Sequence, residues 1–164
     1  MKNKVVLITG SAKGIGKAIA KELAKNGYDI VINYLHSKQE ALFLQKELIA
    51  SYSVDVLAIQ ADVSSVEQVD AMVSEIEEKM GGVDVLVNNA AIDLSNLFHL
   101  KTSEEFQQTM NVNVVGAFNC AKRVSHHMIE KEYGRIINIS SVWGNAGASC
   151  EAAYSATKGA VNSL

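Results

Sequence analysis

Short apolar runs alternate with segments of helical periodicity along the whole sequence, and this alternation limits the folds that are open to the chain. Runs of this length, bounded by glycine and polar residues, are typical of strands that are buried on both faces of a sheet. The predicted strands cover residues 4–9, 30–32, 54–59, 83–87 and 134–139. The predicted helices cover residues 15–25, 40–51, 66–80 and 104–131, and a last helix starts near residue 151.

Strands that alternate with helices in this way form βαβ units with right-handed crossovers, which gives a parallel sheet covered by helices on both faces. We therefore predict an α/β fold with a doubly wound parallel sheet of the Rossmann type and strand order 3-2-1-4-5. At 164 residues the chain fits one domain, which we expect to cover residues 1–164. Such sheets bind ligands at the carboxyl ends of strands 1 and 4, where the direction of winding changes.

Composition narrows the classes of partner. The formal net charge is −3 and the sequence has no broad basic segment, so we expect neither nucleic acid nor a membrane as a partner. The apolar run 5–8 is too short for a signal peptide, and no stretch reaches the ~18 apolar residues of a membrane span. Cys120 and Cys150 form no CxxC pair and have no histidine at ligand spacing. We therefore expect no disulfide and no metal site, and a cytoplasmic location.

The turn between the first strand and the first helix is rich in glycine. Gly10 permits a tight turn, Gly14 lets the backbone approach a bound phosphate, and Gly16 lets the helix pack close to the strand. The helix N-terminus adds free N–H groups and a partial positive charge, which suit an anion. We therefore predict a site for the pyrophosphate of a dinucleotide. The predicted contacts in this turn are Gly10, Ser11, Lys13, Gly14, Ile15 and Gly16.

A P-loop is the nearest alternative for a glycine-rich turn in this position, and the spacing excludes it. The pattern GxxxxGK[ST] needs a glycine five residues after Gly10, where Ile15 stands. Lys17 is also followed by Ala18 instead of serine or threonine. The turn is therefore assigned to a dinucleotide and not to phosphoryl transfer.

The end of the second strand distinguishes NAD from NADP. An NAD site usually has an acidic residue there, which binds the ribose hydroxyls. The segment 33–38 reads Asn-Tyr-Leu-His-Ser-Lys and has no carboxylate. Lys13 would bring a positive charge close to this ribose, and we expect Tyr34 to contact the cofactor at the same place. The predicted cofactor is therefore NADP, with NAD as the less favoured alternative.

Near the end of the sequence, Tyr154 and Lys158 are four residues apart on a predicted helix, so their side chains share one face. A free tyrosine has a pKa of about 10. A nearby ammonium group favours the phenolate and lowers that pKa, which suits acid–base chemistry near neutral pH. Ser141 precedes this pair on the loop after the fifth strand, where it can orient a substrate oxygen.

These motifs together resemble the short-chain dehydrogenase/reductase family. The matching motifs are Thr9-Gly10-x-x-x-Gly14-x-Gly16, Asp62-Val63, Asn88-Asn89-Ala90, Asn113, Ser141 and Tyr154-x-x-x-Lys158. Among its subfamilies the chain is most similar to the 3-oxoacyl-[acyl-carrier-protein] reductases, through residues 134–141 and Asn33-Tyr34. One departure is Ala91, which stands where the family has glycine after Asn-Asn-Ala.

The resemblance implies a set of catalytic roles. Tyr154 would donate a proton to the carbonyl oxygen as hydride arrives from the nicotinamide, and Lys158 would also hydrogen-bond the nicotinamide ribose. Ser141 would bind the substrate oxygen, and Asn113 would hold a water molecule in a proton relay. For Asn113 a second interpretation stays open, in which its side chain satisfies backbone groups in a kinked helix.

The resemblance also implies contacts with the adenosine half of the cofactor. The Asp62 side chain would reach the exocyclic amine of adenine, and the Val63 backbone would add to this contact. The backbone of Asn89 and Ala90 would face the adenosine ribose. Asp62 has an alternative role as a helix cap, which Asp62 or Ser64 could supply.

The implied function is NADPH-dependent reduction of a ketone, a 3-oxoacyl thioester by resemblance, in fatty acid biosynthesis with acyl carrier protein as a possible partner. The alternatives are an alcohol, sugar or steroid dehydrogenase of the same family, or a dinucleotide-binding fragment without catalysis. Members of the family are homo-oligomers with seven strands. We therefore expect this chain to lack strands 6 and 7 and the substrate lid, to leave strand 5 as an exposed edge, and to have an incomplete oligomer interface.

Overall fold

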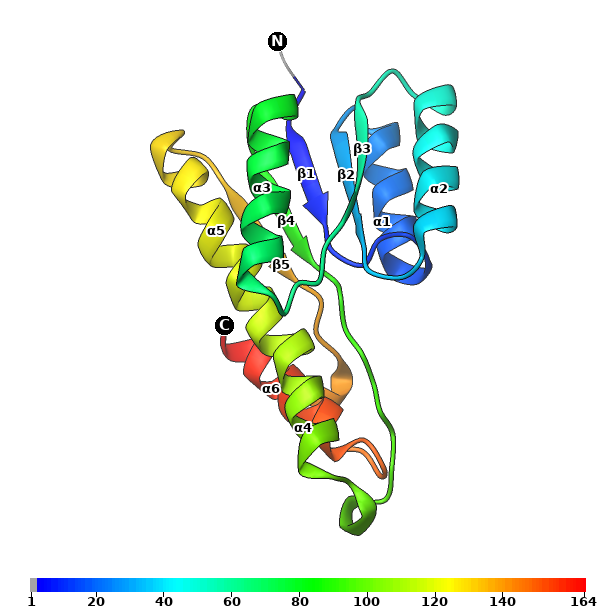
Figure 1. The fold of residues 1–164 in the computed structure, drawn as a ribbon, viewed down its shortest axis with the longest axis vertical. Helices are drawn as coiled ribbons and strands as arrows, with labels where there is room; N and C mark the ends of the chain where they lie inside the picture. The colour runs from blue at the N-terminus through cyan, green and yellow to red at the C-terminus, as the bar shows by residue number, and fades with distance from the viewer. Residues whose placement is uncertain (1–2) are drawn as a thin grey trace.

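The computed structural model describes residues 3–164, and its centre is a five-stranded sheet (Figure 1). The strand order is β3-β2-β1-β4-β5, and every neighbouring pair is parallel. The strands are β1 (Val5–Ile8), β2 (Asp29–Tyr34), β3 (Val56–Gln60), β4 (Val85–Asn88) and β5 (Arg135–Asn138). The predicted fold class and strand order are therefore confirmed, and each strand lies within two residues or so of its predicted range.

Six α-helices connect or follow these strands within the described residues. They are α1 (Gly14–Lys25), α2 (Lys38–Ser51), α3 (Val66–Met80), α4 (Ser103–Met110), α5 (Gly116–Glu130) and α6 (Ala152–Ser163). Two short 3-10 segments, Phe98–Leu100 and Val142–Gly144, were not predicted. No helix in residues 3–164 is both long and apolar enough to cross a membrane.

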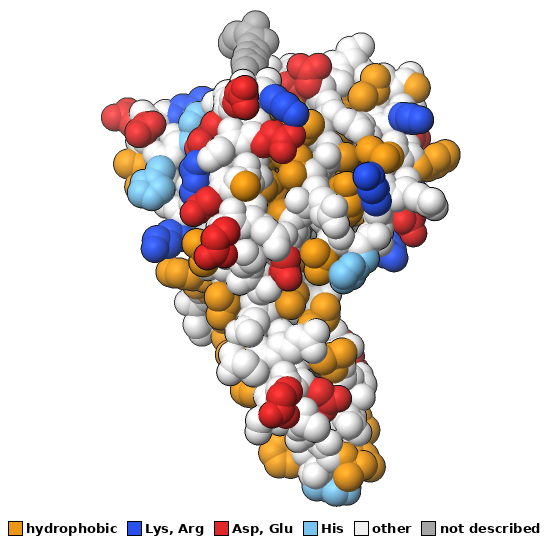
Figure 2. All heavy atoms as spheres, in the orientation of Figure 1, with side chains coloured by type: hydrophobic (Ala, Val, Ile, Leu, Met, Phe, Trp, Pro, Cys, Tyr) orange, Lys and Arg blue, Asp and Glu red, His pale blue; other side chains and the backbone are white. Residues whose placement is uncertain are grey.

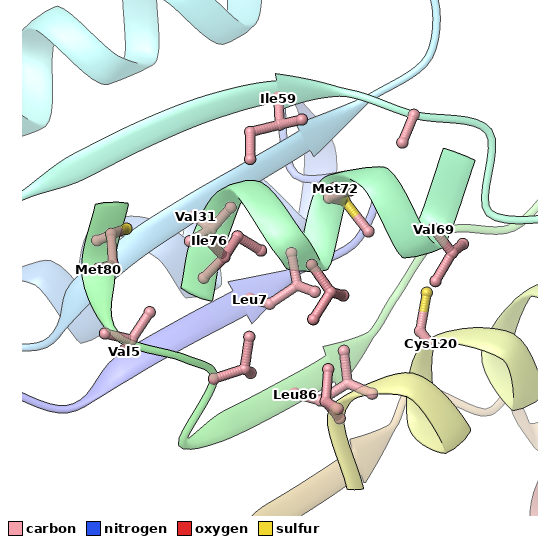
Figure 3. Close-up of a cluster of buried hydrophobic side chains, with 14 of the residues drawn as sticks. Val5, Leu7, Val31, Ile59, Val69, Met72, Ile76, Met80, Leu86 and Cys120 are labelled. Atoms are coloured by element: carbon pink, nitrogen blue, oxygen red, sulfur yellow. The ribbon is translucent and has the colours of Figure 1, made fainter. Parts of the chain in front are cut away.

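The sheet is covered by helices on both faces because its strands are apolar on both sides. Val5 and Leu7 of β1 pack against α3 and α5, whereas Val6 and Ile8 pack against α1 and α2. Figure 3 shows the first of these two cores, where Met72 and Ile76 of α3 and Cys120 of α5 meet the sheet. The two layers of helices hold the sheet between them, and the carboxyl ends of its strands remain available to form the site.

The predicted helix 104–131 is not one regular helix. A π-helical turn, Asn111–Val115, lies between α4 and α5, so the predicted long helix is present but its middle turn is not α-helical. Thr102 and Glu105 form a reciprocal capping box at the start of α4. After the turn, Gly116 packs closely on Val63: an added Cβ would lie 2.6 Å from Val63 Cγ2.

Part of the chain extends beyond the carboxyl edge of the sheet. The segment after β4, helix α4 and helix α6 form this projection, at the bottom of Figure 1. α6 packs against α4 and against the π-helical turn. The residues predicted to be catalytic lie where this projection meets the ends of β4 and β5.

Candidate active site

The glycine-rich turn after β1 has the geometry that a bound anion needs. Gly10 and Gly14 have φ angles of 62° and 59°, which favour glycine. An added Cβ on Gly14 would meet nothing within 4 Å, so this part of the turn faces open space. At Gly16 an added Cβ would lie 2.7 Å from Asn89 Nδ2 and 2.8 Å from Ser11 Cα. Gly16 therefore brings the start of α1 close to the turn after β1, in keeping with the predicted close packing, and also close to Asn89 after β4.

Thr9 and Asn89 join the ends of β1 and β4. The Thr9 Oγ1 atom accepts hydrogen bonds from the backbone N–H groups of Asn89 and Ala90, both at 2.9 Å. In return, Asn89 Nδ2 donates to the carbonyl oxygens of Thr9 at 2.8 Å and Gly10 at 3.2 Å. We call these bonds the Thr9–Asn89 clasp. Because the clasp uses the Asn89 side chain, that side chain has a structural role, whereas the prediction placed only the backbone of Asn89 beside the cofactor.

Asn33, at the end of β2, holds the same turn from the other side. Its Oδ1 atom accepts the Gly10 N–H at 3.1 Å, and its Nδ2 atom donates to the Ala61 carbonyl at 3.0 Å. The sequence analysis used Asn33 as part of the segment without a carboxylate and as part of the family resemblance, and it missed this structural role. A buried amide at the end of an otherwise apolar strand was the available signal.

A cleft of about 600 Å³ runs along the carboxyl ends of β1, β2 and β3. The predicted cofactor residues that line it are Gly10, Lys13, Tyr34, Asp62, Val63, Asn89 and Ala90. Ser11 does not line it, because its buried hydroxyl donates to the Ile8 carbonyl at 2.7 Å. Gly14 and Ile15 are exposed in the turn, and Gly16 is buried behind it. Tyr154 and Lys158 lie outside this cleft.

The part of the cleft beside Tyr34 carries basic and polar side chains. Lys13, His36 and Ser37 line it, and the prediction had not included His36 or Ser37. Of the described residues that line the whole cleft, Asp62 is the only carboxylate. Its Oδ1 atom accepts hydrogen bonds from the Ser64 N–H and hydroxyl, at 2.9 and 2.7 Å.

The alternative role of Asp62 or Ser64 as a helix cap is wrong. The residue that caps α3 is Ser65, whose hydroxyl oxygen accepts the Gln68 N–H at 3.3 Å. Asp62 lies three residues before this cap and lines the cleft. Ala91, the departure from the family motif, needs no special backbone: within residues 3–164 the non-glycine residues with positive φ are Glu132 and Cys150.

Ser141 and Tyr154 line a second cleft, of about 410 Å³. The Ser141 Oγ atom accepts the Trp143 N–H at 3.2 Å, which leaves its own O–H free to donate. Ala91 and Ile92, on the segment after β4, line both this cleft and the cleft along the strand ends. The two clefts therefore share a wall.

Lys158 lies behind Tyr154. Its Nζ atom is 5.5 Å from the centroid of the Tyr154 ring and donates to the Ile139 carbonyl at 2.6 Å. The residue is only 4% exposed, and burial lowers the pKa of its ammonium group because water solvates the charged form better than the protein interior does. The predicted Tyr154–Lys158 pair therefore shares one face of α6.

Asn113 lies in the π-helical turn and is 2% exposed. Its Oδ1 atom accepts the Ile92 N–H at 2.8 Å, and its Nδ2 atom donates to the Ile92 carbonyl at 2.9 Å and to Thr157 Oγ1 at 3.1 Å. The side chain thus satisfies backbone groups, but those of the segment after β4 and not of its own helix. A cavity of about 10 Å³, room for one water molecule, lies between Asn113, Lys158 and Asn88.

With this geometry in place, comparison with known proteins gives the family. The profile of a family described as short chain dehydrogenase matches residues 4–164. The chain belongs to the short-chain dehydrogenase family. This family member is 40% identical over 161 residues to the 3-oxoacyl-[acyl-carrier-protein] reductase FabG of Staphylococcus aureus, covering 98% of this chain and 65% of that protein.

Two further relatives of this short-chain dehydrogenase agree with the fold. It is 40% identical over 158 residues to the 3-oxoacyl-[acyl-carrier-protein] reductase of Synechocystis, covering 96% of this chain and 64% of that protein. The crystal structure of a gluconate 5-dehydrogenase from Burkholderia cenocepacia, in complex with NADP and tartrate, superposes with a TM-score of 0.92 and 36% identity. It covers 100% of this chain and 64% of the gluconate 5-dehydrogenase. The chain therefore spans slightly less than two thirds of the length of these relatives.

Proposed function

We propose that this chain carries the cofactor site and the proton-donor site of an NADPH-dependent carbonyl reductase. The observation that carries the proposal is the shared wall of the two clefts, Ala91 and Ile92. A dinucleotide in the cleft along the strand ends would bring its reactive end to this wall, and a carbonyl beside Ser141 and Tyr154 would face it from the other side. Because this chain spans less than two thirds of the length of its relatives, the activity of the whole protein is also a proposal.

The residues fit a dinucleotide with a 2′-phosphate. The positive φ and open surroundings of Gly14 leave room for a pyrophosphate at the start of α1. Lys13, His36 and Ser37 can donate hydrogen bonds to a phosphate beside Tyr34, where β2 ends without a carboxylate. The gluconate 5-dehydrogenase that shares this fold was crystallised with NADP, which supports the same choice here.

Bound NADPH would supply a hydride to the carbonyl carbon of the substrate. In this mechanism the Tyr154 hydroxyl donates its proton to the carbonyl oxygen, so that the ketone becomes an alcohol and Tyr154 becomes a phenolate. The Ser141 hydroxyl donates a hydrogen bond to the same oxygen and holds it in place. The Lys158 ammonium, 5.5 Å from the Tyr154 ring centroid, stabilises the phenolate by its charge.

For Asn113 the side-chain contacts support a role in positioning. Both hydrogens of its amide are used by Ile92 and Thr157, which ties the shared wall to α6. The small cavity beside Asn113 and Lys158 could seat one water molecule of a proton relay. The relay role proposed for Asn113 thus depends on the cavity that it lines and not on free donors of its side chain.

The substrate class that we propose is a 3-oxoacyl thioester. The two reductases described above are 40% identical to this chain, and both are named for this reaction with acyl carrier protein. The proposal includes acyl carrier protein as the carrier of the thioester and a role in fatty acid synthesis in the cytoplasm. The alternative to this proposal is a fragment that binds a dinucleotide but does not catalyse a reaction.

The test uses Tyr154→Phe, which removes the proton donor and keeps the ring. We expect the variant to lose at least ~100-fold in the rate of NADPH oxidation with acetoacetyl-N-acetylcysteamine, as removal of a general acid does. Calorimetric titration should give the same affinity for NADPH in both proteins, because Tyr154 does not line the cleft along the strand ends. If the unmodified chain binds NADPH and oxidises none with this thioester, the non-catalytic interpretation is correct and the proposal is wrong.

A further inference from the structure

The cleft that holds Ser141 and Tyr154 carries an uneven charge. Two of its lining residues are acidic, Asp93 on the segment after β4 and Glu151 immediately before α6. Its other lining side chains are apolar or neutral, and of the described residues that line it none is lysine, arginine or histidine. Neither the sequence patterns nor the proposed mechanism uses these two carboxylates.

Both carboxylates keep their charge available to the cleft. Asp93 is exposed, and its Oδ2 atom accepts only a neutral hydroxyl, that of Ser95 at 2.7 Å. Glu151 is half-buried, and within residues 3–164 its carboxylate takes part in no ion pair and no hydrogen bond. Two lysines lie near this cleft without lining it: Lys158 donates to the Ile139 carbonyl, and Lys101 donates to the carbonyl of Leu94, next to Asp93. Among the described residues neither lysine forms an ion pair with Asp93 or Glu151, so the charge that lines the cleft itself is negative.

We infer that Asp93 and Glu151 are specificity-determining residues that reject ketones with an anionic group next to the carbonyl. This inference rests on the proposed function and adds the charge of the substrate to it. A carboxylate bound beside Tyr154 would lie near both acidic side chains, and like charges at short range repel one another. An uncharged thioester meets no such repulsion.

The family resemblance alone does not distinguish between a thioester substrate and a substrate with a carboxylate, whereas this inference does. A 3-oxoacyl group is uncharged around its carbonyl while it is a thioester, and becomes an anion when the thioester is hydrolysed. A sugar acid such as a ketogluconate carries a permanent carboxylate together with several hydroxyl groups. The acidic wall therefore favours the thioester and disfavours both the free 3-oxo acid and the sugar acid.

The test compares three ketones with the 164-residue chain: acetoacetyl-N-acetylcysteamine, acetoacetate and 5-ketogluconate. We expect kcat/KM for the neutral thioester to exceed that for either anion by at least ~10-fold, because the two acidic side chains repel a bound anion at a partly exposed site. In the variant Asp93→Asn/Glu151→Gln, kcat/KM for acetoacetate should rise ~10-fold or more, while the value for the thioester should stay within ~3-fold. The matched control is Glu104→Gln, an exposed acid on α4 outside the cleft, which should change neither value.

Calorimetry gives a second measurement that does not depend on turnover. In the presence of NADP, 3-hydroxybutyrate should bind the double variant more tightly than the original chain, and its N-acetylcysteamine thioester should bind both equally. Failure of every ketone, the thioester included, would contradict the proposed function. Reduction of the thioester together with equally efficient reduction of acetoacetate or 5-ketogluconate would leave the proposed function intact and overturn the inference.

Discussion

Two titratable side chains of this protein show how burial acts on single residues. Burial lowers the pKa of the Lys158 ammonium, and it raises the pKa of the Cys120 thiol to about 12. In both cases the interior favours the neutral form, which is the protonated thiol and the deprotonated amine. Cys120 contributes its apolar side chain to the core between α5 and the sheet (Figure 3). Lys158 instead places an ammonium group in the interior, where it donates to the Ile139 carbonyl.

The lowered pKa of Lys158 predicts how the stability of the fold depends on pH. The ordinary pKa of lysine is 10.5, and in the folded protein the pKa of Lys158 lies below it. Between these two values the unfolded chain binds more protons than the folded protein, so the stability due to this group rises with pH. Each unit of pKa depression corresponds to about 1.4 kcal/mol.

The measurement compares the original chain with Lys158→Met in urea denaturation between neutral and alkaline pH. The free energy of unfolding of the original chain should rise relative to that of the variant as the pH increases through the lowered pKa, and the rise should stop above the ordinary lysine value. A difference that does not change with pH would show that burial does not disfavour the ammonium form.

At the scale of secondary-structure elements, α1 depends on a glycine that allows its first turn to approach the sheet. An added Cβ on Gly16 would meet Asn89 Nδ2 at 2.7 Å and two backbone atoms, Ser11 Cα at 2.8 Å and Gly10 O at 3.0 Å. Because backbone atoms cannot rotate away, Gly16→Ala must displace α1 or the turn. We expect the variant to lose ~1–3 kcal/mol of stability, the usual cost of overpacking, and to bind NADPH more weakly.

Gly159→Ala, inside α6, is the matched control for this substitution. The added methyl group would lie 3.5 Å from the Gly144 carbonyl oxygen, an ordinary contact. Alanine is also the better helix former, so the control should be as stable as the original chain or gain up to ~1 kcal/mol. Thermal unfolding measures both variants, and a stable Gly16→Ala protein would contradict the close packing of α1 on the sheet.

The elements also show where sequence patterns stop being informative. The apolar runs and helical periodicities predicted all five strands and the order in which they pair, because both depend on neighbouring residues and on general rules of winding. The π-helical turn could not be predicted from them. It lies where Asn113 bonds to Ile92 and Thr157, which are 21 and 44 residues away in sequence. Local periodicity gives no information about partners that are so far away in the sequence.

At the scale of the whole molecule, the sheet is open at β5. The side chains of Ile136 and Ile137 are 43% and 47% exposed, whereas the four residues of β1 are buried. Lys, Arg, Asp and Glu side chains are interspersed over the upper part of the face seen in Figure 2, so no single sign of charge covers that face. An apolar strand with free backbone groups at a sheet edge is a template for pairing with another chain.

We therefore expect the 164-residue chain to self-associate through β5 as its concentration rises. Ile137→Lys should shift the chain towards the monomer, because a charged side chain on an edge strand opposes pairing. Light scattering over a concentration series measures this shift. The control is Ile129→Lys on α5, a more exposed isoleucine, 73% accessible, that is not on the sheet edge. Equal effects of the two substitutions would place the association elsewhere than on β5.

The candidate site likewise contains some residues that the sequence predicted and others that it could not predict. The turn after the first strand and the end of the second predicted Lys13 and Tyr34, the family resemblance predicted Asp62 and Val63, and all four line one cleft in the structure. His36, Asn33 and the acidic pair Asp93 and Glu151 were missed. Their importance comes from loops that meet only in the folded chain: Asp93 and Glu151 line one cleft although 58 positions separate them in the sequence.

The Thr9–Asn89 clasp affects when, during synthesis of the chain, the glycine-rich turn can first bind a ligand. Its partners are 80 positions apart, so the glycine-rich turn is synthesised long before the residue that holds it. At ~5–20 residues per second, a ribosome needs roughly 4–16 s to cover that distance. During this interval β1, β2 and α1 can form local structure, but the turn is not yet held in its binding geometry. A dinucleotide that needs the held turn would therefore bind only chains in which β4 has already docked.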